Sequence, residues 1–582
     1  MTIEVPFEPL IGELNGKYLK VIDYDATNDR FYRPVDLNQQ FMLMNGGLDP
    51  SESDPRFHQQ MVYAVASKTI GVFEFALGRK IGWAFNKKKP IKTPLRLFPH
   101  AMQDANAFYS RDLEAVIFGY FPASDSDPVT NLPGQPVFTC LSHDIIAHEV
   151  THALIDGQRS RFMEATSVDT LAFHEGFADI VALFQHFTFK EVLVDVIKRT
   201  GGLIYKSDIA PDIDSGGKPQ IVSELKSSNP LVQLAKQFGE AMGQRAALRA
   251  ALGTPPNSNA LEKLFEPHDR GAILVAAVFD AFFTVYIKRV RDLLRIGGVT
   301  FDPRDYINGR ELNADLANRL AIEASKTAEH FCNISIRALD YCPPVDIRFG
   351  EFLRAVITAD FDLVSDDPIG YRQALIDAFR FRGIRPDNVV SYSEGELRWC
   401  APEDSTGNPL VCPGLEFDLF KPLTRKQNAS NAVSLHTFAT GHPKELGLDS
   451  SLTTSVHSFH PLHRISPSGQ IQLEAVSEIT QVKMVPVDAN DPSSGTMPFY
   501  GGVTLIVDLS PERSGQVRYA IRKSIDVSTA SDERLELQRS FYLGAAERYG
   551  NNPYSIQPSM NLPTKTGKGK SGLSFRSVHK GY

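Results

Sequence analysis

Cysteine is scarce in this chain, with five among 582 residues and no C-x-x-C spacing. So few cysteines, odd in number, exclude a disulfide-rich scaffold, although 332 with 342 and 400 with 412 could each close a small loop. Long apolar runs are missing as well. The run at 272–279 stops at Asp280, which is too short for a membrane span and favours a buried core helix. The sequence therefore predicts no membrane-spanning segment.

The chain also lacks an excess of positive charge. Lys and Arg total 61 against 69 Asp and Glu, a formal net charge of −8. This balance argues against nucleic acid as a partner, because general nucleic-acid binding needs a basic surface. The start of the chain, at 1–6, has no basic segment leading into an apolar one, as a secretory signal would. We expect a cytoplasmic protein, with a processed form or a signal-independent secretion route left open.

One stretch concentrates chemically active residues. Residues 143–157 read HDIIAHEVTHALIDG, with His148, Glu149 and His152 in the pattern H-E-x-x-H. Residues four apart lie on one face of an α-helix, so the two imidazoles can bind a single metal ion. Glu149 points a quarter turn away, which suits a general base acting on a water molecule at the metal. Gly157 is expected to cap the end of this helix.

Two acidic residues follow on a second apolar helix. Glu175 and Asp179 lie four apart in the stretch 173–180, FHEGFADI. Catalytic zinc takes three protein ligands and keeps one position for water, and two histidines with one glutamate form one such set. We therefore predict that His148, His152 and Glu175 bind Zn²⁺, and that Asp179 fixes the tautomer of one histidine. A buried polar helix pair, or a site that has lost its metal, is the alternative.

These motifs resemble those of the gluzincin peptidases, most closely the thermolysin-like family. H-E-V-T-H at 148–152 is similar to the first zinc helix of that family, and E-G-F-A-D at 175–179 to its E-x-x-x-D. The resemblance covers about residues 55–390 and is specific only near 100–180. It implies a two-lobed fold, with a β-rich N-lobe, a helical C-lobe and zinc between them, and hydrolysis of peptide bonds in a peptide or protein substrate.

Two further features of the family have counterparts here. N-A-F-Y at 106–109 resembles the edge strand that binds the substrate backbone. By this resemblance Asn106, through its side chain, and Ala107, through its carbonyl, bind an extended peptide. His268 resembles the histidine that stabilises the oxyanion and is oriented by a nearby acid, here residue 266 or 269.

The chain departs from the family pattern in two places near this chemistry. The sequence after His268 reads D-R-G rather than completing the family's H-x-N-S-G, and residues 153–174 contain no tyrosine to serve as an oxyanion donor. These departures favour an alternative function, a catalytically weak or inactive thermolysin-like protein that binds a peptide or partner. The presence of Glu149 argues for the enzyme, a zinc-dependent endopeptidase. An exopeptidase would need an N-terminus-binding signature, and none stands out.

The fold class expected is α+β, with an additional β-rich domain. Residues 1–157 form the N-terminal lobe, 158–395 the helical catalytic lobe, 396–560 the β-rich accessory domain and 561–582 a basic flexible tail. A polar stretch at 200–230 is expected to form a lid or cleft wall. Alternating segments predict strands in the accessory domain near 470–487, 502–509 and 516–528. No particular oligomeric state is indicated.

Overall fold

The chain is a mixed α+β protein with one sheet in its N-terminal part and a separate sheet near its C-terminus. The computed structural model describes residues 2–123 without 13, 88 and 90, then 132–199, 212–213, 219–220, 256–298, 312–465 without 419 and 420, 469, 471–491, 495–525 and 529–549. The predicted tail at 561–582 lies outside these residues, as does most of the stretch at 200–230.

The N-terminal sheet has five strands. In spatial order they are β1 (Leu19–Val21), β4 (Leu95–Gln103), β6 (Ala115–Pro122) and β5 (Ala107–Ser110), with β7 (Pro136–Phe138) paired to the end of β6. Strand β6 is buried over most of its length, as its continuous apolar sequence predicts for a strand covered on both faces. Among the described strands β5 pairs only with the antiparallel β6, so its other side is an edge.

Helix α2 (Pro55–Leu77) buries one apolar face, which includes Val62, Val65, Ile70 and Phe73. The Asp54 side chain caps its start by accepting a hydrogen bond from the Arg56 backbone N–H, and Gly78 ends it with a φ of 67°. The smaller elements of the N-terminal part are the strands β2 (Tyr24–Asp25) and β3 (Arg30–Phe31) and the helix α1 (Gln40–Asn45).

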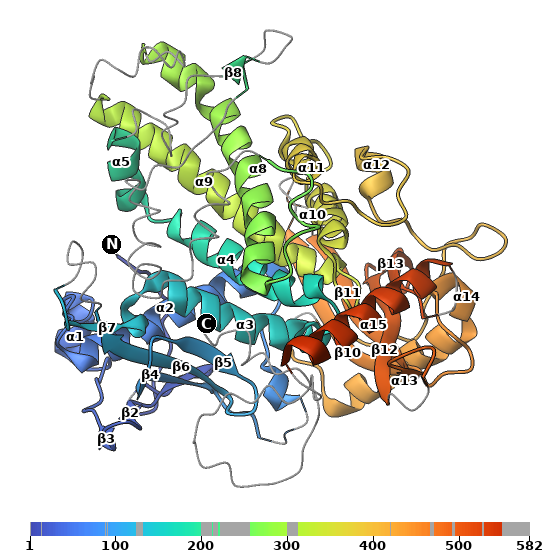
Figure 1. Ribbon diagram of the computed structural model, residues 1–582, viewed down its shortest axis with the longest axis horizontal. Coiled ribbons are helices and arrows are strands. Elements are labelled where there is room, and N and C mark those ends of the chain that lie inside the picture. The colour runs from blue at the N-terminus through green and yellow to red at the C-terminus, as the bar shows by residue number, and fades with distance from the viewer. Residues whose placement is uncertain are drawn as a thin grey trace.

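Two buried helices lie between this sheet and the helical part of the molecule (Figure 1). They are α3 (His143–Gln158) and α4 (Val168–His186), capped at their starts by the side chains of Ser142 and Ser167. The expectation that Gly157 ends α3 is wrong, because the helix continues through it. A Cβ at Gly157 would lie 2.1 Å from the Gly82 carbonyl oxygen. The glycine therefore serves a close approach of two backbones.

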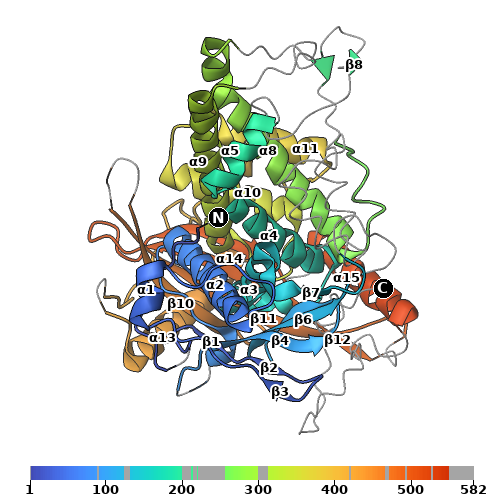
Figure 2. The ribbon, with the colours of Figure 1, turned by 90° about the vertical axis from the view of Figure 1, so that its left-hand side faces the viewer.

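Helices dominate the part of the chain after α4, and Figure 2 shows them above α3 and α4. They are α5 (Lys190–Arg199), α8 (Pro267–Ile296), α9 (Ala314–Ala338), α10 (Phe349–Leu363), α11 (Tyr371–Phe381) and α12 (Glu394–Leu397). Two short strands, β8 (Asp212–Ile213) and β9 (Pro219–Gln220), pair with each other. Of the helices in the described residues, only α8 is long and apolar enough to cross a membrane, and 67% of its most apolar window is buried inside the protein. It packs as a core helix, as its apolar run at 272–279 predicts.

The C-terminal sheet is antiparallel, with the order β10-β11-β12-β13. Its strands are β10 (Ser455–Ile465), β11 (Ile471–Pro486), β12 (Thr496–Asp508) and β13 (Val517–Lys523), and the helices around it are α13 (Arg425–Gly441), α14 (Pro443–Leu446) and α15 (Thr529–Tyr549). The three predicted strands of this region are confirmed. Strand β10 is not among the predicted strands. It contains Pro461 and lies at the edge of the sheet, where proline is tolerated.

This sheet shares a core with the rest of the chain. Leu462, Val476, Ile506 and Ile521 belong to the same buried cluster as residues of α3, α4, α8, α9 and α10. At the end of α3, the buried Arg159 donates hydrogen bonds to Glu478 of β11 at 2.9 Å and to the Leu339 carbonyl at 2.7 Å. The C-terminal sheet is thus packed directly against the helix that carries the H-E-x-x-H motif. The predicted boundaries of the lobes and domains stay predictions.

Candidate metal centre

Three buried side chains from α3 and α4 direct ligand atoms at a common point. The Nε2 atoms of His148 and His152 are 3.0 Å apart. A carboxylate oxygen of Glu175 lies 3.3 Å from His148 Nε2, and the other lies 3.7 Å from His152 Nε2. A tetrahedral zinc ion with ligand distances of about 2.0–2.1 Å holds its ligand atoms about 3.3 Å apart. The spacing of these three groups therefore fits one zinc ion.

The far sides of the two rings are also engaged. His148 Nδ1 lies 2.8 Å from an Asp179 carboxylate oxygen, which can only accept a hydrogen bond from it when ionised. Nδ1 then carries the hydrogen, and the lone pair of Nε2 faces the cluster. His152 Nδ1 lies 3.2 Å from Nδ1 of His174, a residue that sequence reasoning did not single out. In the sequence, only the position of His174 next to Glu175 could have indicated a role for it. A ring held through Nδ1, with the Nε2 lone pair directed at the cluster, is the arrangement of a metal-binding histidine.

Glu149 is hydrogen-bonded to the edge strand β5. Its Oε2 accepts a hydrogen bond of 3.0 Å from the backbone N–H of Tyr109, and the side chain is buried. Backbone groups along an edge strand alternate in direction, so Ala107, two residues earlier, presents its N–H and C=O on the same free side of β5. Asn106 directs its own carbonyl the other way, to the Gly119 N–H at 2.8 Å. The expected peptide-binding edge and the expected general base are therefore adjacent.

A part-buried ion pair fastens this strand to α3. Asp156, one turn beyond His152, accepts hydrogen bonds from the Tyr109 hydroxyl at 2.7 Å and from Arg111 Nε at 2.8 Å. Burial, and then the charge of Asp156, raise the pKa of Tyr109 well above its usual value, so the phenol stays protonated. Sequence reasoning missed these positioning residues, because their contacts join separate elements. Their hydrogen bonds fix the position of β5 relative to α3.

His268 lies beside the three converging groups, in the first turn of α8. Its Nε2 is 3.3 Å from a Glu175 oxygen and its Nδ1 is 2.9 Å from Glu266, while its side chain stays 31% exposed. The acid that orients it is thus Glu266, and Asp269 only donates its backbone N–H to that carboxylate at 2.7 Å. Burial disfavours the charged form of the ring, but Glu175 and Glu266 outweigh it and raise the pKa of His268 to about 10.

A contact between two glycines allows this approach. A Cβ added to Gly176 would lie 2.8 Å from the Gly271 carbonyl oxygen, and a Cβ at Gly271 would lie 2.8 Å from the Ala172 carbonyl oxygen. Helices α4 and α8 therefore cross backbone against backbone. The crossing stands next to Glu175 on one helix and one turn after His268 on the other, which explains how the two side chains meet.

No model of a known protein family matches this chain, and no curated protein shows significant sequence similarity to it. Its function is therefore inferred from the geometry of this site.

Proposed function

We propose that this protein is a zinc-dependent endopeptidase, a divergent relative of the thermolysin-like peptidases with their two-lobed catalytic fold. The observation that carries the proposal is the convergence of the His148, His152 and Glu175 ligand atoms beside a buried glutamate that is hydrogen-bonded to an edge strand. A binding site without chemistry has no use for that glutamate, because burying a carboxylate is costly.

His148, His152 and Glu175 would hold the zinc ion, and Asp179 would keep the His148 ring in the tautomer that offers Nε2. When bound there, zinc lowers the pKa of water and polarises a peptide carbonyl. The two imidazoles are neutral ligands and Glu175 supplies one negative charge, so the ion together with its three ligands would carry one net positive charge. That charge favours the anion that develops on the carbonyl oxygen during attack.

Glu149 acts as the general base and then as the general acid. Its carboxylate accepts a proton from the attacking water and returns that proton to the leaving nitrogen of the peptide bond. The hydrogen bond from the Tyr109 N–H to Oε2 orients the carboxylate for this transfer. Because β5 is tied to α3 through Asp156, the base keeps its position relative to the two histidines.

His268 supplies an oxyanion donor, the role of the family histidine that it resembles. Its Nδ1 bond to Glu266 directs Nε2 toward the centre, where Nε2 now contacts Glu175. In the working enzyme this Nε2–H would donate to the oxyanion, and the side chain remains open enough to reach a substrate.

The substrate would be an extended peptide that adds a strand to the free edge of β5. Ala107 offers its backbone N–H and C=O on that side, and the Asn106 side chain can bind the next peptide group. Because these contacts are to the peptide backbone, they predict cleavage inside a chain and weak dependence on its sequence.

The test is cleavage of a quenched peptide by the wild type, by Glu149→Gln and by Glu191→Gln, with bound zinc measured in each. Glu149→Gln should keep zinc and lose hydrolysis by several orders of magnitude, whereas His148→Ala should lose the zinc. Glu191 is exposed on α5, so Glu191→Gln controls for the loss of a carboxylate and should cleave normally.

A chelator should abolish cleavage, and added zinc should restore it. Cleavage by Glu149→Gln at the wild-type rate would refute the mechanism. A wild type that binds zinc and peptide but cleaves nothing would indicate the binding protein instead.

A further inference from the structure

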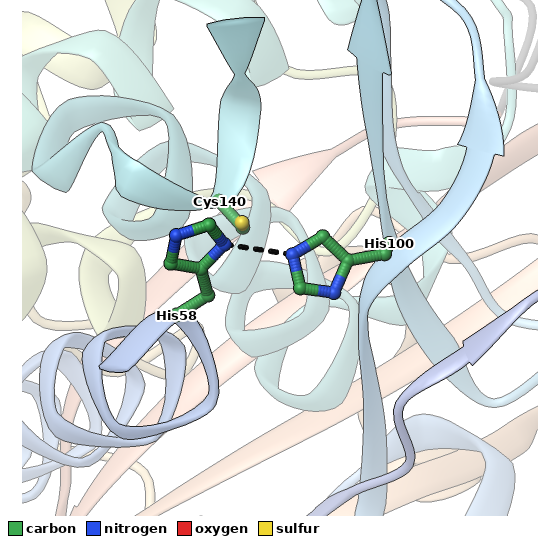
Figure 3. Close-up of side chains that lie close together, drawn as sticks. All are labelled: His58, His100 and Cys140. Atoms are coloured by element: carbon green, nitrogen blue, oxygen red, sulfur yellow. Dashed lines mark hydrogen bonds between the residues drawn. The ribbon is translucent and has the colours of Figure 1, made fainter. Parts of the chain in front are cut away.

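A second cluster of metal-binding side chains lies apart from the first, between α2 and the N-terminal sheet. It consists of His58 on α2, His100 on β4 and Cys140 in the short 3₁₀ helix Thr139–Leu141 (Figure 3). One ligand atom from each lies within 4.8 Å of the others, and all three residues are buried. His58 Nδ1 and His100 Nε2 are 2.7 Å apart.

The outer nitrogens of both rings face groups that can only accept. His100 Nδ1 lies 2.7 Å from an Asp23 carboxylate oxygen, and His58 Nε2 lies 3.1 Å from the Glu52 backbone carbonyl. The other Asp23 oxygen accepts a hydrogen bond from Gln59. Each outer nitrogen therefore carries the hydrogen, and a neutral ring then has a lone pair on its inner nitrogen. Two lone pairs facing each other at 2.7 Å repel unless a cation lies between them.

That cation is either a shared proton or a metal ion, and Cys140 decides in favour of the metal. A shared proton needs only the two rings, whereas the thiol adds a third, softer ligand on the same side. Burial raises the pKa of the Cys140 thiol well above its usual value. Burial, and then His100, lower the pKa of His58 to about 4.

We propose that His58, His100 and Cys140 bind a second metal ion, a divalent cation of the zinc type. Two imidazoles and one thiolate are ligands that zinc prefers over calcium or magnesium. On binding, Cys140 releases its thiol proton to water and its sulfur donates an electron pair to the ion. The thiolate and Asp23 together balance the charge of the cation. The two inner nitrogens then separate to about 3.3 Å, the spacing around tetrahedral zinc.

The position of the site indicates a structural role. His100 lies where the pairing of β4 with β6 shifts register between Phe98 and Met102, an irregularity that turns its ring inward. Cys140 precedes the first residue of α3 by three positions. An ion here would join α2, the sheet and the start of the helix that carries His148 and His152. The rings of Phe138 and Tyr32 pack against the histidines and shield the site from water.

The experiment separates the two sites by working in a His148→Ala/His152→Ala background, which removes the first. The full-length protein is loaded with Co²⁺, and its bound metal and absorption spectrum are measured. We expect one Co²⁺ per chain, with the thiolate-to-cobalt charge-transfer band that histidine and carboxylate ligands cannot produce. Adding Cys140→Ser should abolish the band. Adding Cys332→Ser, which removes a buried thiol on α9, should leave it intact.

A folded background protein without bound cobalt, or a band that survives Cys140→Ser, would overturn the proposal and leave a shared proton between the rings. X-ray absorption of the zinc-loaded wild type needs no variant and guards against misfolding. One sulfur ligand for every two zinc ions supports the proposal, and a spectrum without sulfur refutes it.

Discussion

Replacing Asp340 with alanine should destabilise the whole protein, including the candidate active site. Asp340 lies between α9 and the C-terminal sheet and accepts two hydrogen bonds from Arg79 at 2.6 and 2.7 Å and one from Arg464 of β10 at 2.8 Å. Arg79 follows α2 and also binds Gln158 at the end of α3. Through Arg79 and Arg464, one carboxylate therefore connects the C-terminal sheet to the ends of α2 and α3.

The expected magnitude follows from burial. The side chains of Asp340, Arg79 and Arg464 are 1%, 7% and 4% exposed. Removing one partner of a buried pair leaves an uncompensated charge and costs about 3–5 kcal/mol. Asp377→Ala is the matched control, because Asp377 pairs with Arg380 at the surface, where both are at least 36% exposed. Such a pair contributes about 0.3–0.5 kcal/mol.

The assay is urea unfolding of the wild type and both variants, followed by tryptophan fluorescence and by peptidase activity. Burial would raise the pKa of Asp340, but Arg79 and Arg464 lower it below its usual range. A lowered pKa contributes stability above about pH 4 that is lost as the pH falls. The difference in free energy of unfolding between the wild type and a further variant, Asp340→Asn, should therefore become smaller at acidic pH. The reasoning fails if Asp340→Ala unfolds at the same urea concentration as Asp377→Ala.

Three further outcomes are expected. Asp179→Asn should weaken zinc affinity about 10–100-fold, measured by competition with a chelator, because the His148 ring loses its orienting acceptor. His268→Ala should lower kcat for a quenched peptide about 10²–10³-fold with zinc content unchanged, as loss of an oxyanion donor does. Burial lowers the pKa of His186, but Asp144 raises it by more. This pair stabilises the fold below about pH 6.5, and the stabilisation is lost as the pH rises through the folded pKa. Thermal unfolding midpoints should thus fall more steeply toward alkaline pH in the wild type than in His186→Gln.

Local periodicity predicted most of the elements around the site. The four-residue spacing of His148 and His152 needs only a helix to bring both rings to one face, and the apolar run at 115–122 needs only a covered sheet to become a strand. Such patterns are properties of consecutive residues, so they can be read from the sequence. The errors arose where the role of a residue depends on a contact with a residue far away in the sequence. Gly157 was expected to end a helix, but its place is set by the Gly82 carbonyl.

The sequence by itself determined which residue types could bind a metal, and at which spacing within one helix. Only the tertiary structure decided which elements meet. The contact of His268 with Glu175 depends on the crossing at Gly176, and the cluster of His58 with Cys140 joins segments more than eighty positions apart. The physical reason is that periodicity describes one element at a time. Contacts between elements depend on how closely their backbones approach and on which buried polar atoms face one another.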